Sequence, residues 1–232
     1  MKEDRCELEI KIEQVWKEDN WSPMVIHHPK FLEIAPFIRS IKFKLDQAVY
    51  HLENVLNYES KVQDVLVTQN YHTNLMTTKY ELDSLIYALN SVKDILAKLI
   101  CTVYDINKKN IDEIYFSTLV NKKTDEYRKL KIKKPTLFSH LVSFNKTEER
   151  KFVQNYCNSI KHQDALLTHT VLNQDNKADV LTMIPDPKNP KQELVRVFAP
   201  KVEEKHREAI CAAGQIIIPD LGYKRRIDSD VT

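Results

Sequence analysis

Residues 81–103, ELDSLIYALNSVKDILAKLICTV, carry the clearest structural pattern in the chain. Apolar residues recur there in alternating steps of three and four, which is the period of one helix face. The stripe consists of Leu82, Leu85, Leu89, Val92, Leu96, Leu99 and Val103. Four polar residues are expected to face away from it: Asp83, Lys93, Asp94 and Lys98. The pattern predicts a long amphipathic helix that begins near Thr73, or at a capping box of Thr78 and Glu81.

A second long helix is predicted over residues 31–58, where apolar residues follow the same period. Pro36 fits best in a first turn, which would move the helix start to about Ala35. Two such helices bury their apolar faces most simply as an antiparallel pair. Residues 3–19 show a narrower stripe, and Trp16 and Trp21 are expected to dock it onto the body of the protein.

The second half of the chain changes character along its length. Residues 136–144 predict a short element, and Asn145 is expected to cap a helix over residues 146–164. That helix should bury Phe152, Val153, Tyr156 and Ile160. Strands are predicted at 166–172, 179–184 and 194–198, with a rigid proline loop over 185–190. A helix over 202–213, capped by Gly214, and a last strand over 215–218 complete the pattern.

These elements predict a mainly α fold, an antiparallel helical bundle with a small C-terminal α/β appendage. The expected division is an N-terminal helical extension over 1–28, the bundle over 29–165 and the appendage over 166–232. Short strands are not stable alone in water, so the appendage is expected to pack on the helices.

Several classes of function are excluded by residues that the chain lacks. Gly214 and Gly222 are the only glycines, so no loop can cradle phosphates and no dinucleotide fingerprint exists. The four cysteines lie far apart and are expected to be reduced thiols, with no metal site and no cofactor. There is no apolar leader and no run long enough to cross a bilayer, so the cytosol is the expected compartment.

A basic segment over residues 122–134 is a candidate surface for nucleic acid. Its bases outnumber Asp125 and Glu126: Lys122, Lys123, Arg128, Lys129, Lys131, Lys133 and Lys134. Lysine and arginine could contact phosphates in a salt-dependent way. The segment has no clustered aromatic residues, so a solvated charged connection is the alternative.

Residues 157–162, Cys-Asn-Ser-Ile-Lys-His, resemble the signature of HEPN domains (higher eukaryotes and prokaryotes nucleotide-binding). The family motif is an Arg followed by a polar residue and then a His, within the last helix of a helical bundle. Asn158 matches the polar position and His162 the His, whereas Cys157 stands in place of the Arg. The two long helices that precede the motif are also similar to the family's architecture.

The resemblance implies a homodimer that binds RNA or cleaves it without a metal, in a prokaryotic defence or toxin–antitoxin setting with an antitoxin as a possible partner. His162 would move a proton, beside Asn158 and Lys161. A neutral thiol at Cys157 cannot bind phosphate as Arg does, so activity would be weakened. Lys151 and Lys161 supply nearby cations.

Two alternatives stay open beside RNA cleavage. One is a non-catalytic dimeric scaffold or regulator that keeps the motif helix only as an interface. The other is an accidental match on an unrelated fold. The helix dipole alone also explains a Lys and a His in a last helical turn.

Overall fold

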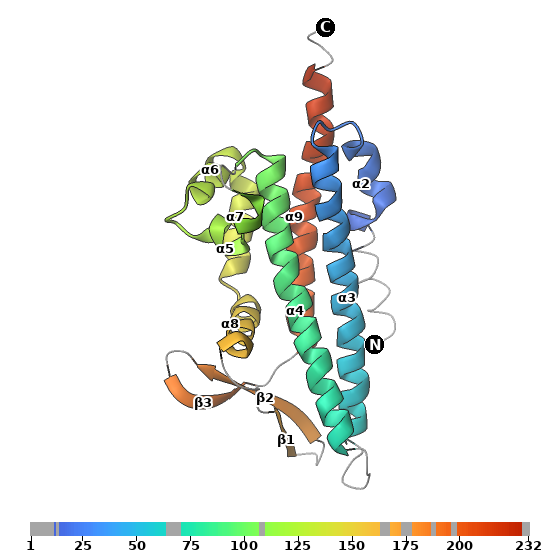
Figure 1. Ribbon diagram of the computed structural model, residues 1–232, viewed down its shortest axis with the longest axis vertical. Helices are drawn as coiled ribbons and strands as arrows, with labels where there is room; N and C mark the ends of the chain where they lie inside the picture. Colours follow the sequence, from blue (N-terminus) through green and yellow to red (C-terminus); the bar gives the residue numbers. More distant parts are fainter. Residues whose placement is uncertain are drawn as a thin grey trace. The chain divides into compact units, whose positions relative to one another are not determined.

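The computed structural model describes residues 12, 14–63, 71–106, 110–162, 168–172, 178–186, 189–195 and 199–228. Within these ranges the chain is mainly helical, which confirms the predicted class (Figure 1). The first elements are α2 (Glu18–Val25), α3 (Phe31–Gln63), α4 (Tyr71–Val103), the 3-10 helix η1 (Ile111–Glu113) and α5 (Phe116–Val120). They are followed by α6 (Asp125–Lys133), α7 (Pro135–Asn145), α8 (Glu148–His162), β1 (Thr168–Leu172), β2 (Ala178–Asp186), β3 (Asn189–Val195) and α9 (Ala199–Asp228).

The chain forms two compact units, each built from segments that lie far apart in the sequence. Unit 1 holds residues 1–45, 91–147 and 206–232, and unit 2 holds residues 46–90 and 148–205. Helices α3, α4 and α9 therefore contribute residues to both units. The predicted division at residues 28 and 165 stays a prediction, since a compact unit is not by itself an independently folding domain.

Helices α3 and α4 run antiparallel within each unit, as their apolar stripes predict. In unit 1, Lys30 Nζ donates to the Thr102 carbonyl at 3.2 Å. In unit 2, His51 Nδ1 lies 2.7 Å from a Glu81 carboxylate oxygen. The predicted stripe of α4 is buried throughout: Leu82, Leu85, Leu89, Val92, Leu96, Leu99 and Val103.

The polar face of α4 is not the solvated face that the sequence predicts. Lys93 is buried. The Asp94 carboxylate accepts the Phe116 N–H at 2.8 Å, at the start of α5. Asp83 accepts the Tyr156 hydroxyl of α8 at 2.5 Å. Periodicity identified the apolar side correctly, but α5 and α8 pack on the polar side and bury part of it.

Helix α3 begins where its apolar period predicts, and Pro36 does not move the start to Ala35, whereas α4 begins slightly earlier than predicted. Helix α3 starts at Phe31, and Pro36 lies inside it, where it removes one backbone hydrogen bond near the start. Helix α4 starts at Tyr71. The Thr78 hydroxyl donates to the Asn74 carbonyl at 2.9 Å, so this threonine bonds the preceding turn and does not cap the helix.

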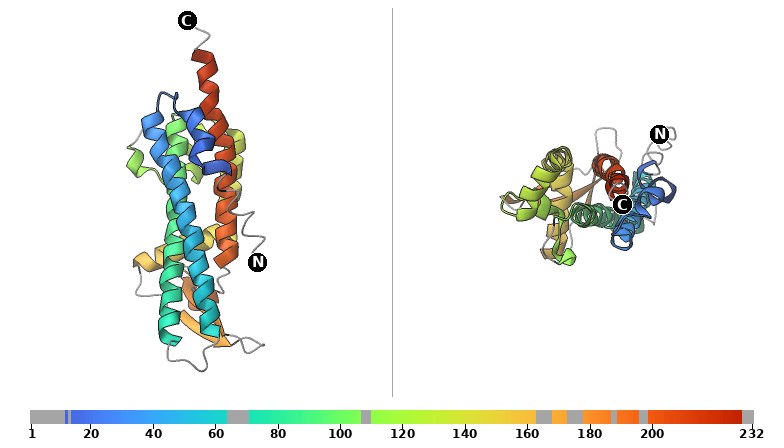
Figure 2. Two further views of the ribbon diagram at one scale, coloured as in Figure 1. Left: turned by 90° about the vertical axis from the view of Figure 1, so that its right-hand side faces the viewer. Right: turned by 90° about the horizontal axis from the view of Figure 1, so that it is seen from above.

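The two tryptophans dock the N-terminal segment within unit 1, as predicted. Trp16 and Trp21 are buried, and the Trp21 indole N–H donates to the Trp16 carbonyl at 3.1 Å. Arg39 of α3 pairs with Glu18 at 2.6 Å. Helix α2 lies beside α3 (Figure 2) and continues through Pro23.

Helix α9 corrects the predicted C-terminal appendage. It is one continuous helix, so Gly214 does not cap it and residues 215–218 are not a strand. From His206 onward α9 belongs to unit 1. A Cβ at Gly214 would lie 2.5 Å from Trp16 Cζ2 and 2.6 Å from Val15 Cγ1. The glycine permits close helix packing. The α/β appendage predicted over 166–232 is not supported, because its residues from His206 onward are helical and belong to unit 1.

The three strands form one antiparallel sheet in the order β1–β2–β3. Thr170 pairs with Val180 across the first ladder, and Met183 pairs with Leu194 across the second. The second ladder is irregular between Ile184 and Asp186. The connection between β2 and β3 is shorter than the predicted loop over 185–190, and backbone of β2 lies against α8 within unit 2.

Helix α6 forms within the basic segment over 122–134, for which a charged surface connection was the alternative prediction. Thr124 caps α6 by accepting the Tyr127 N–H at 3.3 Å. Pro135 then begins α7, which runs through Asn145, so Asn145 does not cap α8. Across the described part of the chain, no helix combines the length and apolar character that a bilayer span requires.

Candidate functional site

Helix α8, which carries the motif predicted to be functional, is a packed element of unit 2. Of the four residues predicted to be buried, Val153 and Tyr156 are buried, Phe152 is half-buried, and the side chain of Ile160 lies outside the described residues. Lys151, Asn155 and Asn158 are exposed. The short bond to Asp83 and burial raise the Tyr156 pKa far above its ordinary value, with burial the larger cause. Tyr156 therefore ties α8 to α4 as a neutral phenol.

Cys157 lies in the core of unit 2 and not on the surface of α8. Its side chain is 1% exposed and belongs to a cluster drawn from four helices. The cluster includes Ala48, Leu85, Leu89, Val153, Tyr156 and Val202. The position that the resemblance assigns to a phosphate-binding arginine thus faces apolar packing in this chain.

Asn158 points to solvent, whereas the preceding residue, Cys157, points into the core. The Gln154 amide donates to the Asn158 oxygen at 3.1 Å, one turn earlier on α8. Lys161 and His162 form the end of α8, and their side chains lie outside the described residues. Cys157 and Asn158 are therefore not brought to a common surface, and the roles assigned to Lys161 and His162 stay predictions.

The basic residues predicted to bind nucleic acid separate into two groups. Lys122, Lys123 and Lys131 are exposed. Within the described ranges, no carboxylate lies within ion-pair distance of these three lysines. Arg128 is exposed and lies 3.3 Å from Asp125, and Lys151 lies 2.6 Å from Glu148.

The C-terminal end of α4 is closed by a Schellman motif. Asp105 adopts a left-handed backbone with φ 50°, and the Ile106 N–H donates to the Cys101 carbonyl at 3.1 Å. Glycine usually occupies such a position, but aspartate tolerates it better than most residues. Ile106 is fully buried, so this turn anchors the helix end in unit 1.

Three lysine ammonium groups bind the carbonyls around this helix end. Lys133 Nζ donates to the Tyr104 carbonyl at 2.8 Å, and Lys129 Nζ donates to the Ile106 carbonyl at 3.0 Å. Lys30 bonds both Thr102 and the Asp105 carboxylate. Cations are stabilised at a helix C-terminus by the orphan carbonyls and the dipole. Lys129 and Lys133 therefore hold α6 to α4, which leaves fewer bases of this segment for phosphate.

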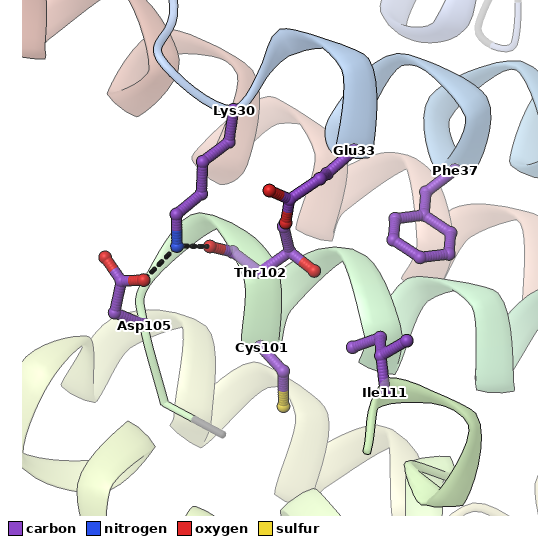
Figure 3. Close-up of a pocket in the computed structure, with 7 residues that line it drawn as sticks. All are labelled: Lys30, Glu33, Phe37, Cys101, Thr102, Asp105 and Ile111. Carbon is purple, nitrogen blue, oxygen red and sulfur yellow. Dashed lines mark hydrogen bonds and ion pairs between the residues drawn. The ribbon is translucent and has the colours of Figure 1, made fainter. Parts of the chain in front are cut away.

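A pocket of about 310 Å³ opens in unit 1 between α3, the end of α4 and η1. It is lined by Lys30, Glu33, Phe37, Cys101, Thr102, Asp105 and Ile111. Figure 3 shows charged groups at one end, with Lys30 and Asp105 bonded to each other, and the side chains of Phe37 and Ile111 at the other. The pocket thus has a polar end and an apolar end.

Cys101 forms part of the pocket wall as a neutral thiol. Burial, followed by the nearby Glu126 carboxylate, raises the pKa of Cys101 to about 12. A thiol with that pKa is a poor nucleophile at neutral pH. Among the residues that the structure describes, no group of three His, Cys, Asp or Glu side chains is placed to hold a metal ion.

The chain was compared with protein-family models, with curated proteins and with solved structures, and none of them matches it.

The pocket is the part of the site that sequence reasoning missed. Lys30, Glu33 and Phe37 recur at helical spacing along α3, which could have indicated one shared face. No local signal, however, relates them to Cys101 and Asp105, which are about 70 residues away in the sequence. Only the antiparallel packing of α3 on α4 brings these residues together.

Proposed function

We propose that this protein is a non-catalytic helical scaffold or regulator that works as a homodimer. The observation that carries the proposal is the burial of Cys157, which is 1% exposed in the core of unit 2. RNA cleavage of the HEPN kind needs a cation at that position, and a neutral thiol inside an apolar cluster cannot supply one. The same helix contributes to packing through Val153 and Tyr156.

Exposed aromatic residues on the long helices support a role in binding proteins. Phe43 of α3, in unit 1, is 59% exposed. In unit 2, Tyr80 and Tyr87 lie seven residues apart on α4, so they share a face, and both are exposed. Tyrosine and phenylalanine are enriched at protein interfaces, where large rings bury much area at little entropic cost.

The first experiment tests catalysis. Labelled RNA is incubated with the purified protein in EDTA, and wild type is compared with His162→Ala. We expect no cleavage by either protein. Wild-type cleavage that disappears in His162→Ala would overturn the proposal and restore the metal-independent ribonuclease predicted from the resemblance. Any role in defence or beside an antitoxin depends on that outcome.

The second experiment tests the dimer by light scattering coupled to size-exclusion chromatography. We expect a dimer for wild type and a monomer for Phe43→Asp or for the double variant Tyr80→Asp/Tyr87→Asp. Tyr115→Asp is the matched control, since Tyr115 is also exposed but lies in the connection before α5. A wild-type monomer at all concentrations would contradict the dimeric part of the proposal.

RNA binding without cleavage is the second candidate, and the exposed lysines at the start of the α6 region favour it. The double variant Lys122→Glu/Lys123→Glu should weaken RNA binding and reduce its salt dependence. Lys17→Glu/Lys146→Glu changes the charge equally at other exposed sites and serves as the control. Equal loss of affinity in both variants would point to net charge and not to this surface.

A further inference from the structure

The pocket of unit 1 lies outside the motif helix and outside the proposed interface. Its lining combines one ammonium group and two carboxylates with apolar side chains from three elements. Its volume of about 310 Å³ is at the lower end of the range for small-molecule sites. A ligand for this pocket must therefore be small, and it must satisfy charges at one end and apolar surface at the other.

The charges of the pocket are only partly satisfied by the protein. Lys30 Nζ has three donors, and within the described ranges its acceptors are the Thr102 carbonyl and the Asp105 carboxylate. The Glu33 carboxylate is exposed, and no cation of the described ranges lies within ion-pair distance of it. One ammonium donor and one carboxylate thus remain for a ligand, within a single turn of the chain at the start of α3.

The remaining wall is apolar and stays apolar at neutral pH. Phe37 follows Glu33 by four residues, so the ring lies one turn further along the same face of α3. Ile111 comes from η1, and Cys101 from the last turn of α4 is 2% exposed. In Figure 3, Glu33 lies between Lys30 and Phe37, so the order is cation, anion and apolar surface.

We propose that this pocket binds a small zwitterion, an α-amino acid with an apolar side chain. The ligand carboxylate accepts from Lys30 and the ligand ammonium pairs with Glu33. The ligand side chain packs against Phe37 and Ile111. A ligand that has only an ammonium pairs with Glu33 but leaves the third Lys30 donor unused, and a ligand that has only a carboxylate leaves Glu33 unpaired beside a second negative charge.

The test uses three probes that share one carbon skeleton, observed by saturation-transfer NMR with the full chain. The probes are L-leucine, 3-methylbutylamine, which lacks the carboxylate, and 4-methylpentanoate, which lacks the ammonium. We expect millimolar binding of leucine, and each single-charge probe should bind about fivefold more weakly, as for a partly exposed ion pair. Equal binding of the three probes, or no saturable binding of leucine, would overturn the proposal.

Variants locate the site. Glu33→Gln should weaken leucine about fivefold, because the ammonium contact is lost, and should not weaken 4-methylpentanoate, which has no ammonium and is relieved of a like charge. Phe37→Ala should weaken all three probes. Glu113→Gln, with the same charge change at an exposed residue of η1 outside the lining, should change none of them. Leucine binding that persists unaltered in both Glu33→Gln and Phe37→Ala would place the ligand elsewhere and refute this site.

Discussion

At the scale of single residues, Gly214 shows how one position can decide the packing of two elements. Glycine inside a helix costs about 1 kcal/mol relative to alanine, so an isolated helix would gain from Gly214→Ala. In this protein a Cβ at that position would lie 2.5 Å from Trp16. Real Cβ contacts do not occur at such distances, so the tryptophan or α9 would have to shift.

We therefore expect Gly214→Ala to lower the unfolding free energy by about 1–3 kcal/mol, the usual cost of overpacking. Urea denaturation followed by circular dichroism measures it. Gln215→Ala, the next residue and exposed, is the control and should change stability by no more than about 0.5 kcal/mol. A stabilised Gly214→Ala protein would show that Trp16 does not contact α9 at this residue.

At Cys157, the buried environment determines which substitutions the protein tolerates. Cys157→Arg introduces the residue that the HEPN motif has at this position, but it puts a charged group into the core cluster of unit 2. Burying an unpaired charge typically costs several kcal/mol. We expect Cys157→Arg to be destabilised or unfolded and Cys157→Ala to lose about 1 kcal/mol. Thermal unfolding of both variants checks this, and a stable Cys157→Arg with new ribonuclease activity would contradict the structural assignment.

At the scale of elements, lysines of α6 act as caps for α4. Lys131 and Lys133 are both exposed, but the Lys133 ammonium donates to the Tyr104 carbonyl, whereas the Lys131 side chain faces solvent. We expect Lys133→Met to lower the unfolding free energy by about 1–2 kcal/mol, because a buried helix end loses a charge-assisted hydrogen bond. Lys131→Met, the same change on the same helix, should be nearly neutral. Urea unfolding compares them, and equal effects would argue against a capping role.

The capping lysines also change what the basic segment means. Seven bases over 122–134 predict a phosphate-binding surface when they are counted in sequence. Helix α6 turns Lys129 and Lys133 toward α4, and Lys134 pairs with Asp220 at 2.8 Å. Because the segment is helical, some of its lysines contact α4 and others face solvent. An irregular linker would not orient them in this way.

At the scale of the whole molecule, buried acidic groups predict sensitivity to alkali. Burial, and then the hydrogen bond to Asp220, raise the pKa of Tyr104. Burial also raises the pKa of Cys101, to about 12. Both groups ionise more easily in the unfolded chain, where cysteine has a pKa of 9.0. The contribution of Cys101 to stability is therefore complete below pH 9 and is lost as pH rises toward 12, whereas that of Tyr104 is complete below pH 10 and is lost above it.

We expect the unfolding free energy to fall above pH 9 by on the order of 1 kcal/mol per pH unit for each such group. Urea unfolding at intervals between pH 8 and about pH 11 measures this. Cys101→Ala should show a shallower fall than wild type over the same range, since it removes one of the ionising groups. Identical slopes would show that the Cys101 thiol is not buried in solution.

Local sequence patterns predicted some features of the two units correctly and others wrongly. The stripe of α4 predicted its buried face residue by residue, and Trp16 and Trp21 were correctly expected to dock. Thr78, Asn145 and Gly214 were wrongly read as caps, because capping signals also suit residues that bond a preceding turn or permit close packing. Local chemistry permits several structures at such residues, and the neighbouring element selects one.

The sequence by itself determined the helical class, the antiparallel pairing of α3 with α4 and the buried face of α8, because periodic apolar residues must leave water together. Only the tertiary structure decided that Cys157 faces the core, that α9 completes unit 1, and that Lys30, Glu33 and Phe37 share a pocket with Cys101. Those outcomes depend on which elements contact each other. The apolar pattern of one segment does not show which distant segment it packs against.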